Sequence, residues 1–270
     1  MSVINVDAFK ALYPELEPMA KRLQVLKTNQ NLPQVVVFGK FNHGKSTLLN
    51  ALLGQAVFAA SDARQTIANQ THVDQQRQIV WVDTPGLDAD IVGTDDQHAY
   101  EGAMVQADII LLVHNLNTGE LDQHEVSHFS KMLSAQDGLH QKAVLVITQI
   151  DQVSEEQKEQ ALRIIKGQLP SIKIHLVSAV RYQKGMAENK KPLVERSGIP
   201  ELLQSLETLR AETTQVRLNE TKQLSQKIRE TLHQERQALA EQIASLKAKQ
   251  QRMQADFDQD LTKYFNLFTV

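Results

Sequence analysis

Short apolar runs alternate along the chain with stretches in which apolar residues recur every three or four positions. The runs predict β-strands, and they are residues 35–38, 78–82, 108–115, 143–148 and 172–177; a further strand is expected at residues 71–74. The periodic stretches predict helices directly after the first strand and at residues 94–106, 117–136 and 155–169. The side chains expected to face the sheet are Leu121, Val126, Phe129 and Leu133 in one stretch, and Ala161, Leu162, Ile164 and Ile165 in another. Strands that alternate with helices favour an α/β fold, with a mostly parallel sheet covered by helices on both faces.

The first 33 residues precede the first predicted strand. Pro14 predicts that one helix ends near Tyr13 and that another begins at Pro14 or Glu15. The apolar stripe of this segment consists of Phe9, Leu12, Leu16, Met19, Leu23 and Leu26. Two interpretations stay open: the stripe packs on the nearest apolar surface, or it pairs with the C-terminal helix.

The C-terminal segment, residues 212–270, predicts one or two long helices, because the chain has no proline or glycine after Pro200. Its apolar residues lie near heptad spacing, interrupted at Gln250, and they are Leu239, Ile243, Leu246, Met253, Phe257, Leu261 and Tyr264. This pattern favours a coiled coil, with the N-terminal helix or with another copy. The predicted domains are therefore a helical segment at 1–33, a central domain at 34–211 and a helical segment at 212–270.

Composition and charge narrow the classes of function. The 270 residues carry a net charge of −3, so no overall positive field favours nucleic acid, and no DNA partner is expected. The absence of cysteine excludes disulfides and thiolate metal sites. The N-terminus lacks the apolar core of a signal peptide, and no apolar run is long enough to span a bilayer. The expected location is cytoplasmic, with peripheral membrane contact as an open alternative.

A glycine loop after the first strand predicts a phosphate-binding site. Gly39, Gly44, Lys45 and Ser46 fill the fixed positions of the motif G-x-x-x-x-G-K-S. Backbone N–H groups of such a loop and the following helix N-terminus favour anionic oxygens. Lys45 is expected to reach the outer phosphates, and the Ser46 hydroxyl to ligate Mg²⁺. The loop residues expected to contact a bound nucleotide are Gly39, Asn42, His43, Gly44, Lys45, Ser46 and Thr47.

A second motif, DTPG at 83–86, ends the strand at 78–82. An aspartate at this strand end can hold Mg²⁺ through water, so Asp83 is a candidate metal ligand. The Gly86 amide is expected to approach the γ-phosphate.

The polar loop at 55–70 holds a third set of candidates. Thr66 is expected to complete the Mg²⁺ shell, so the predicted metal set is Ser46, Thr66 and Asp83. Thr71 competes for this role but lies in a predicted strand. Arg64 is expected to be a solvated loop arginine, with charge stabilisation on the phosphates as the alternative.

The order of these motifs resembles that of translation-factor-class GTPases. GKFNHGKS, Thr66 and DTPG are followed by TQID at 148–151 and SAV at 178–180. The phosphate loop is similar to those of bacterial dynamin-like G domains and of Era and MnmE-type G domains, and the resemblance covers residues 34–210. It implies a G domain that binds GTP or GDP with Mg²⁺. It also implies that the nucleotide contacts Thr148, Gln149, Asp151, Ser178, Ala179 and Val180.

The base-reading motif departs from the family pattern, because Gln149 stands where lysine is usual. Within the resemblance, the Asp151 carboxylate accepts the guanine N1 and N2 hydrogens, which adenine does not offer. Gln149 can cover the ring without adding charge, so we expect a preference for guanine with weaker affinity. The alternative is a strand end followed by a helix cap.

The residue that activates water is also unusual. Small signalling GTPases would have a catalytic glutamine directly after DTPG, where this chain has Leu87. Asn42 matches the loop asparagine that helps hold K⁺ in Era and MnmE-like GTPases, so the predicted catalytic set is Lys45, Thr66 and Asn42. The alternative is that Asn42 only suits the turn backbone. A lone histidine at His43 is expected to be exposed to solvent.

The expected activity is hydrolysis of GTP to GDP and phosphate by a nucleotide-gated switch or a dynamin-like mechanochemical GTPase. The alternatives are a non-hydrolysing regulatory module, an Era-like ribosome-associated GTPase, an ATPase and a coiled-coil protein with a degenerate fold. The expected partner is a guanine nucleotide. A nucleotide-dependent homodimer, a membrane and the ribosome are open alternatives for further partners.

Overall fold

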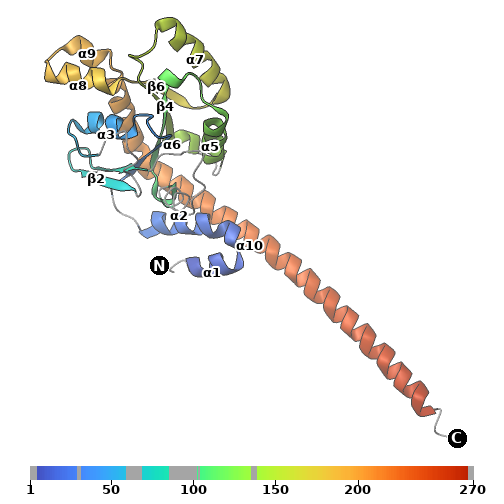
Figure 1. Ribbon diagram of the computed structural model, residues 1–270. Helices are drawn as coiled ribbons and strands as arrows, with labels where there is room; N and C mark the ends of the chain where they lie inside the picture. Colours follow the sequence, from blue (N-terminus) through green and yellow to red (C-terminus); the bar gives the residue numbers. More distant parts are fainter. Residues whose placement is uncertain are drawn as a thin grey trace. The chain divides into compact units, whose positions relative to one another are not determined.

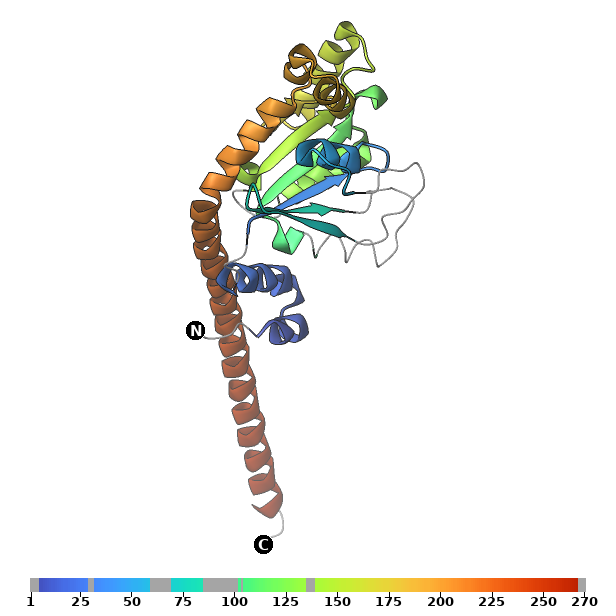
Figure 2. The ribbon, with the colours of Figure 1, turned by 90° about the vertical axis from the view of Figure 1, so that its left-hand side faces the viewer.

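The computed structural model describes residues 5–28, 32–58, 69–84, 102, 104–134 and 139–266. These residues contain a six-stranded sheet in the order β2-β3-β1-β4-β5-β6 (Figure 1, Figure 2). The strands are β1 (Gln34–Gly39), β2 (Gln70–Asp74), β3 (Ile79–Asp83), β4 (Ile109–Asn115), β5 (Ala143–Thr148) and β6 (Lys173–Leu176). β2 is antiparallel to β3, and the other neighbouring strands are parallel. The predicted fold class, a G domain with a mostly parallel sheet, is therefore confirmed.

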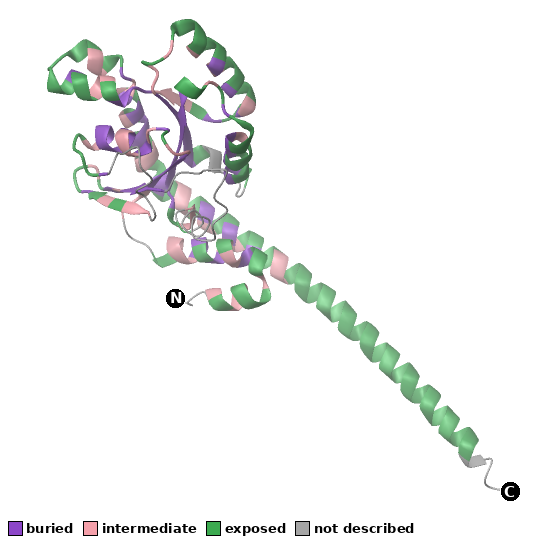
Figure 3. Ribbon diagram, in the orientation of Figure 1, coloured by how far each residue is buried: buried purple, intermediate pink, exposed green. Residues whose placement is uncertain are grey.

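Helices cover both faces of the sheet, because successive residues of each strand point to opposite sides. Val36 and Phe38 of β1 belong to one buried cluster with residues of α5 (Gln123–Ser134) and α7 (Glu155–Gln168). Val35 and Val37 belong to a second cluster with α3 (Lys45–Leu53), α8 (Ala179–Ala187) and the first turns of α10 (Ile199–Asn266). Figure 3 shows the resulting buried strands in purple. Burial on both faces explains why these strands are continuous apolar runs.

The N-terminal segment forms α1 (Val6–Leu12), a 3₁₀ turn η1 (Pro14–Leu16) and α2 (Glu17–Thr28). This confirms the break predicted at Pro14. The remaining short elements are η2 (Leu116–Thr118), α6 (Leu139–Lys142) and α9 (Lys191–Glu195).

A cluster of charged side chains joins α2 to α10 and to the residue before β4. Arg22 of α2 is only 1% exposed. Its guanidinium donates to Glu220 of α10 at 2.8 and 2.9 Å and to Asp108 at 3.2 Å. Lys142 and Arg217 complete this group, which we call the Arg22 cluster. The N-terminal segment is thus fixed by ion pairs in addition to its buried Leu16, Ala20 and Leu23.

The chain divides into two compact units, residues 1–223 and 224–270, and α10 contributes to both. α10 is continuous, so the C-terminal segment forms one helix. Residues 233–264 are all exposed, including the near-heptad apolar positions (Figure 3). None of the helices in the described ranges has an apolar stretch of the kind that crossing a membrane requires. The boundaries predicted at residues 33 and 211 stay predictions.

Two expectations about helices are wrong. The helix expected at 117–136 begins at Gln123, because Gly119 adopts φ +92° and the Asp122 carboxylate accepts from the backbone N–H of His124 and Glu125 at 3.0 Å. Ile164 of α7 is 40% exposed instead of facing the sheet. The helix expected at 94–106 lies outside the described residues apart from 102 and 104–106, which are helical.

Candidate functional site

The phosphate loop, residues 39–46, leaves β1 at Gly39 and enters α3 at Lys45. A Cβ at Gly39 would lie 2.3 Å from the carbonyl oxygen of Val113 in β4, so only glycine fits there. Asn42 and Gly44 adopt left-handed backbone torsions, with φ of +59° and +85°. Gly44 is also the N-cap of α3, so the helix N-terminus directly follows the loop. The loop therefore has the conformation and helix context that favour an anionic ligand.

Lys45 lies in the first turn of α3 and is 8% exposed. Its ammonium group donates to the carbonyl oxygens of Gly39 at 2.9 Å and Lys40 at 3.0 Å. The charged group is thus held across the loop to which it belongs. This arrangement presents a fixed positive charge where the loop would bind phosphate oxygens.

Ser46 and Asp83 come together from α3 and β3. The Ser46 hydroxyl donates to Asp83 Oδ2 at 2.7 Å, and Asp83 is 1% exposed. Burial raises the pKa of Asp83, although the Ser46 hydrogen bond and the Lys45 charge act in the opposite direction. Among the described residues, the buried Asp83 Oδ1 has no hydrogen-bond partner. A hydroxyl beside a buried carboxylate with an unsatisfied oxygen fits a divalent cation with a preference for oxygen ligands.

The DTPG motif is described only in its first half. The Thr84 hydroxyl donates to the Val37 carbonyl of β1 at 2.7 Å, which fixes the end of β3 against the start of the loop. Thr71 is a residue of β2, as predicted. Thr66, Gly86, Leu87 and Arg64 lie outside the described residues, so their roles stay predictions.

The end of β5 contacts the phosphate loop directly. The Thr148 hydroxyl lies 2.8 Å from the His43 carbonyl oxygen, and it donates there or to the His114 carbonyl at 3.2 Å. Gln149 has φ +57°, and its amide donates to the Asn42 carbonyl at 3.4 Å. Asp151 follows and is exposed. The TQID segment is therefore brought against the loop, with its aspartate open to solvent.

The end of β6 contributes the SAV segment. Ser178 is buried, and its side chain caps α8 by accepting from the Arg181 N–H at 3.0 Å. Its own N–H donates to the Ser197 carbonyl at 2.8 Å. Ala179 and Val180 form the first turn of α8, and Val180 is 58% exposed. Because parallel strands end at one edge of a sheet, SAV lies at the same edge as the loop, DTPG and TQID.

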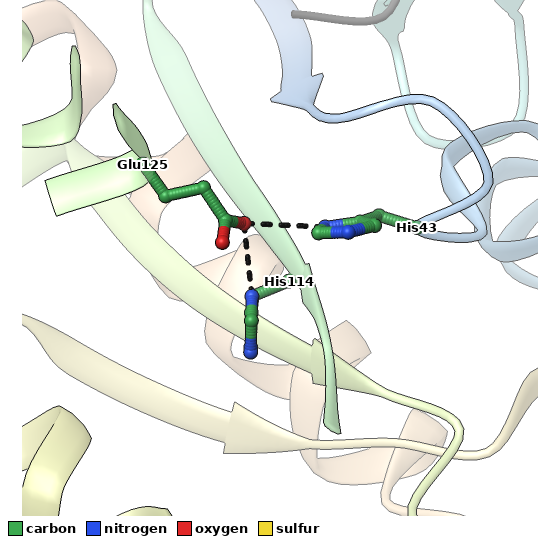
Figure 4. A group of neighbouring side chains, drawn as sticks. All are labelled: His43, His114 and Glu125. Atoms are coloured by element: carbon green, nitrogen blue, oxygen red, sulfur yellow. Dashed lines mark hydrogen bonds and ion pairs between the residues drawn. The ribbon is translucent and has the colours of Figure 1, made fainter. Parts of the chain in front are cut away.

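The expectation that His43 is exposed is wrong, because it is only 6% exposed. Its ring faces Glu125 of α5 and lies near His114 of β4 (Figure 4). Sequence reasoning did not select His114 or Glu125. One available signal was a histidine within the otherwise apolar run of a fully buried strand.

A family model described as 50S ribosome-binding GTPase matches residues 34–178. An uncharacterized protein of Acinetobacter baylyi is 37% identical over 270 residues, which cover 98% of this chain and 63% of that protein. The GTPase Era of Thermotoga petrophila is 29% identical over 153 residues, which cover 54% of this chain and 49% of Era. The chain thus spans about half to two thirds of the length of these relatives.

Solved structures show the same fold. Era in complex with MgGDPNP and a 16S ribosomal RNA fragment superposes with a TM-score of 0.53 at 22% identity, covering 67% of this chain and 57% of Era. One chain of an oligomerised bacterial dynamin pair superposes with a TM-score of 0.53 at 16% identity, covering 97% of this chain and 51% of the other. The family match confirms the resemblance to translation-factor-class G domains. The chain therefore belongs to the family described as 50S ribosome-binding GTPase, and residues 34–178 carry its G domain.

Proposed function

We propose that this protein binds GTP with Mg²⁺ and hydrolyses it to GDP and phosphate, as a nucleotide-gated switch or a dynamin-like mechanochemical GTPase. The observation that carries the proposal is the group at the start of α3. There the buried Lys45 ammonium spans the loop, and Ser46 contacts Asp83 at 2.7 Å. These residue types in this arrangement serve phosphoryl transfer.

Each residue has a defined role in this proposal. Lys45 and the loop N–H groups bind the β- and γ-phosphate oxygens and stabilise their charge. Ser46, Thr66 and Asp83 would hold Mg²⁺, which would supply positive charge beside the phosphates. We expect the Gly86 amide to approach the γ-phosphate.

We further propose that Asp151 selects guanine, with Gln149 covering the base and Ser178, Ala179 and Val180 closing the far side of the base site. The contacts of Thr148 and Gln149 with the phosphate loop support this assignment, because they tie base recognition to phosphate binding. A competition assay with GTP and ATP tests it. Equal competition by ATP would contradict a guanine role for Asp151.

Asn42 is our candidate for binding K⁺ beside the phosphates, which would add positive charge there. Its exposed position in the loop supports this role. Its left-handed torsion also supports the simpler role of a turn residue. We expect faster phosphate release in K⁺ than in Na⁺, and equal rates would remove Asn42 from catalysis.

The second candidate function is a regulatory module that binds GTP without hydrolysing it. Leu87 favours this alternative, because its side chain cannot orient a water molecule. Tightly bound, unhydrolysed GTP after prolonged incubation with Mg²⁺ and K⁺ would support it.

The proposed further partners are a second copy of the chain in a GTP-dependent homodimer, a membrane surface and the ribosome. Sedimentation with liposomes or ribosomes, with and without a GTP analogue, distinguishes the last two.

The central test is Lys45→Ala, with Lys166→Ala as a matched control, because Lys166 is an exposed lysine of α7. We expect calorimetry to show loss of GTP binding in Lys45→Ala and unchanged binding in Lys166→Ala. We likewise expect phosphate release to be lost in Lys45→Ala and unchanged in Lys166→Ala. Unchanged GTP affinity in Lys45→Ala, or no binding by the parent protein, would refute the proposal.

A further inference from the structure

Three side chains converge behind the phosphate loop, and the proposed function gives none of them a role in phosphoryl transfer. They are His43 of the loop, His114 of β4 and Glu125 of α5, and their exposed fractions are 6%, 0% and 4%. Both histidines face the same carboxylate oxygen (Figure 4). Glu125 Oε1 lies 2.9 Å from His114 Nδ1 and 3.2 Å from His43 Nδ1. One ligand atom from each residue lies within 4.8 Å of the others.

When both histidines are neutral, His114 has one N–H too few for its two hydrogen-bond acceptors. His114 Nε2 lies 2.9 Å from the Gly119 carbonyl oxygen, and Nδ1 lies 2.9 Å from Glu125 Oε1. Both neighbours are acceptors, whereas a neutral imidazole carries only one N–H. The other carboxylate oxygen of Glu125 accepts the Asp122 N–H at 3.2 Å. An additional positive charge, a proton or a metal ion, must therefore lie between His114 and Glu125.

A proton between His114 and Glu125 would satisfy that pair, but it would not account for His43. His43 Nδ1 is buried, and within the described residues it has no hydrogen-bond partner, although Glu125 Oε1 is close.

We propose that His43, His114 and Glu125 bind a divalent transition-metal ion of the Zn²⁺ class through His43 Nδ1, His114 Nδ1 and Glu125 Oε1. Two imidazoles and a carboxylate form a ligand set that zinc uses in proteins. Ligands of a tetrahedral zinc ion lie about 3.3 Å apart at bond lengths of ~2.0 Å. The observed separations of 2.9 and 3.2 Å from Glu125 Oε1 are close to this value.

The surroundings of the ligands also fit a metal site. His114 Nε2–H donates to the Gly119 carbonyl, which is how metal-bound histidines are usually oriented. The Asp122 N–H holds the second oxygen of Glu125 in the same way. An ion on His114 Nδ1 takes the place that a proton between this atom and Glu125 Oε1 would otherwise occupy.

This site is separate from the proposed Mg²⁺ site, and the inference does not rest on the proposed function. Its ligands come from different side chains, and none of them is Ser46, Thr66 or Asp83. An ion bound there would tie the phosphate loop to β4 and α5, because each of the three ligands comes from one of these segments. The loop would then be fixed from behind by metal coordination.

The experiment uses the full chain without an affinity tag and without nucleotide. The protein is dialysed against a chelator, incubated with Zn²⁺, desalted and analysed by mass spectrometry and calorimetry. We expect one Zn²⁺ per chain and a rise in Tm with Zn²⁺ that Mg²⁺ does not produce. Glu125→Gln and His114→Gln should weaken Zn²⁺ binding by more than about 100-fold, since loss of even an outer partner costs 10–100-fold. His124→Gln, an exposed histidine of the same helix, is the matched control and should bind as the parent does.

Two results would overturn the inference. The first is a parent protein that retains no stoichiometric Zn²⁺ and shows no rise in Tm, a measurement that requires no variant to fold. The second is a Glu125→Gln or His114→Gln variant that binds Zn²⁺ as tightly as the parent.

Discussion

Replacing Arg22 tests whether the Arg22 cluster fixes the N-terminal helix to the G domain. The guanidinium donates to Glu220, Asp108 and the Val105 carbonyl, with donor–acceptor distances from 2.8 to 3.2 Å. Arg22→Met keeps most of the side-chain volume but removes all of these bonds. Glu220 and Asp108 then each lose one cationic partner while remaining buried.

The magnitude follows from the partners that remain. Removing one member of a buried ion pair costs about 3–5 kcal/mol, because the other charge is left uncompensated. Here Glu220 keeps Lys142 at 3.0 Å, and Asp108 keeps Arg217 at 2.6 and 2.9 Å. We therefore expect a loss near the lower end, about 3 kcal/mol in the free energy of unfolding.

Urea unfolding followed by tryptophan fluorescence measures this loss. Trp81 is the only tryptophan and is fully buried in β3, so its signal reports on the G domain. Lys21→Met is the matched control, because Lys21 is the neighbouring residue of α2 and pairs with Glu17 at the surface. We expect Lys21→Met to lower the free energy of unfolding by less than about 0.5 kcal/mol.

A double variant separates the ion pair from general damage to α2. Arg22→Met combined with Glu220→Gln should cost about 2 kcal/mol less than the sum of the single variants, because the two side chains interact directly. Additive losses would refute the reasoning. So would an Arg22→Met loss no larger than that of Lys21→Met.

Three further predictions concern other parts of the fold. Gly198→Ala should destabilise the protein by at least about 2 kcal/mol in urea unfolding, because φ is +70° and a Cβ would lie 1.9 Å from the Leu176 carbonyl oxygen; an unchanged midpoint would contradict this geometry. Burial lowers the pKa of Lys142 to about 8, so between that value and its ordinary 10.5 the unfolded chain holds a proton that the folded chain has released. The free energy of unfolding should therefore rise from about pH 8 to pH 10 by roughly 2 kcal/mol more in the parent than in Lys142→Met. A difference between the two proteins that does not change with pH would contradict the lowered pKa. Thr148→Val removes the hydroxyl next to the His43 carbonyl and should weaken guanine nucleotide binding about tenfold by calorimetry, whereas equal affinity would show that this contact does not position the loop.

The sheet and the nucleotide motifs were predictable because their signals are local. A strand buried on both faces must be apolar throughout, and the phosphate loop needs glycine, lysine and serine at fixed spacing. The break at Pro14 follows equally from one residue, because proline cannot continue a helix at that point.

The buried charges were not predictable, because their partners lie far apart in the sequence. Arg22 and Glu220 are separated by 198 positions, and each resembles an ordinary solvated helix charge in isolation. His43 of the phosphate loop likewise meets a partner that is distant in the sequence, Glu125 of α5. The start of α5 was misplaced because Asp122 caps the helix, and the apolar period alone does not show this.

Two independent constraints require glycine at position 39: the phosphate loop that begins there and the close approach of β4. A methyl group at this position would push apart the two central strands whether or not any phosphate is present. A descendant that had lost nucleotide binding would still need glycine here to keep its strands paired. Retention of Gly39 in a distant homologue is therefore weak support for an intact ligand site, whereas retention of Lys45 and Ser46, which no strand pairing requires, is informative.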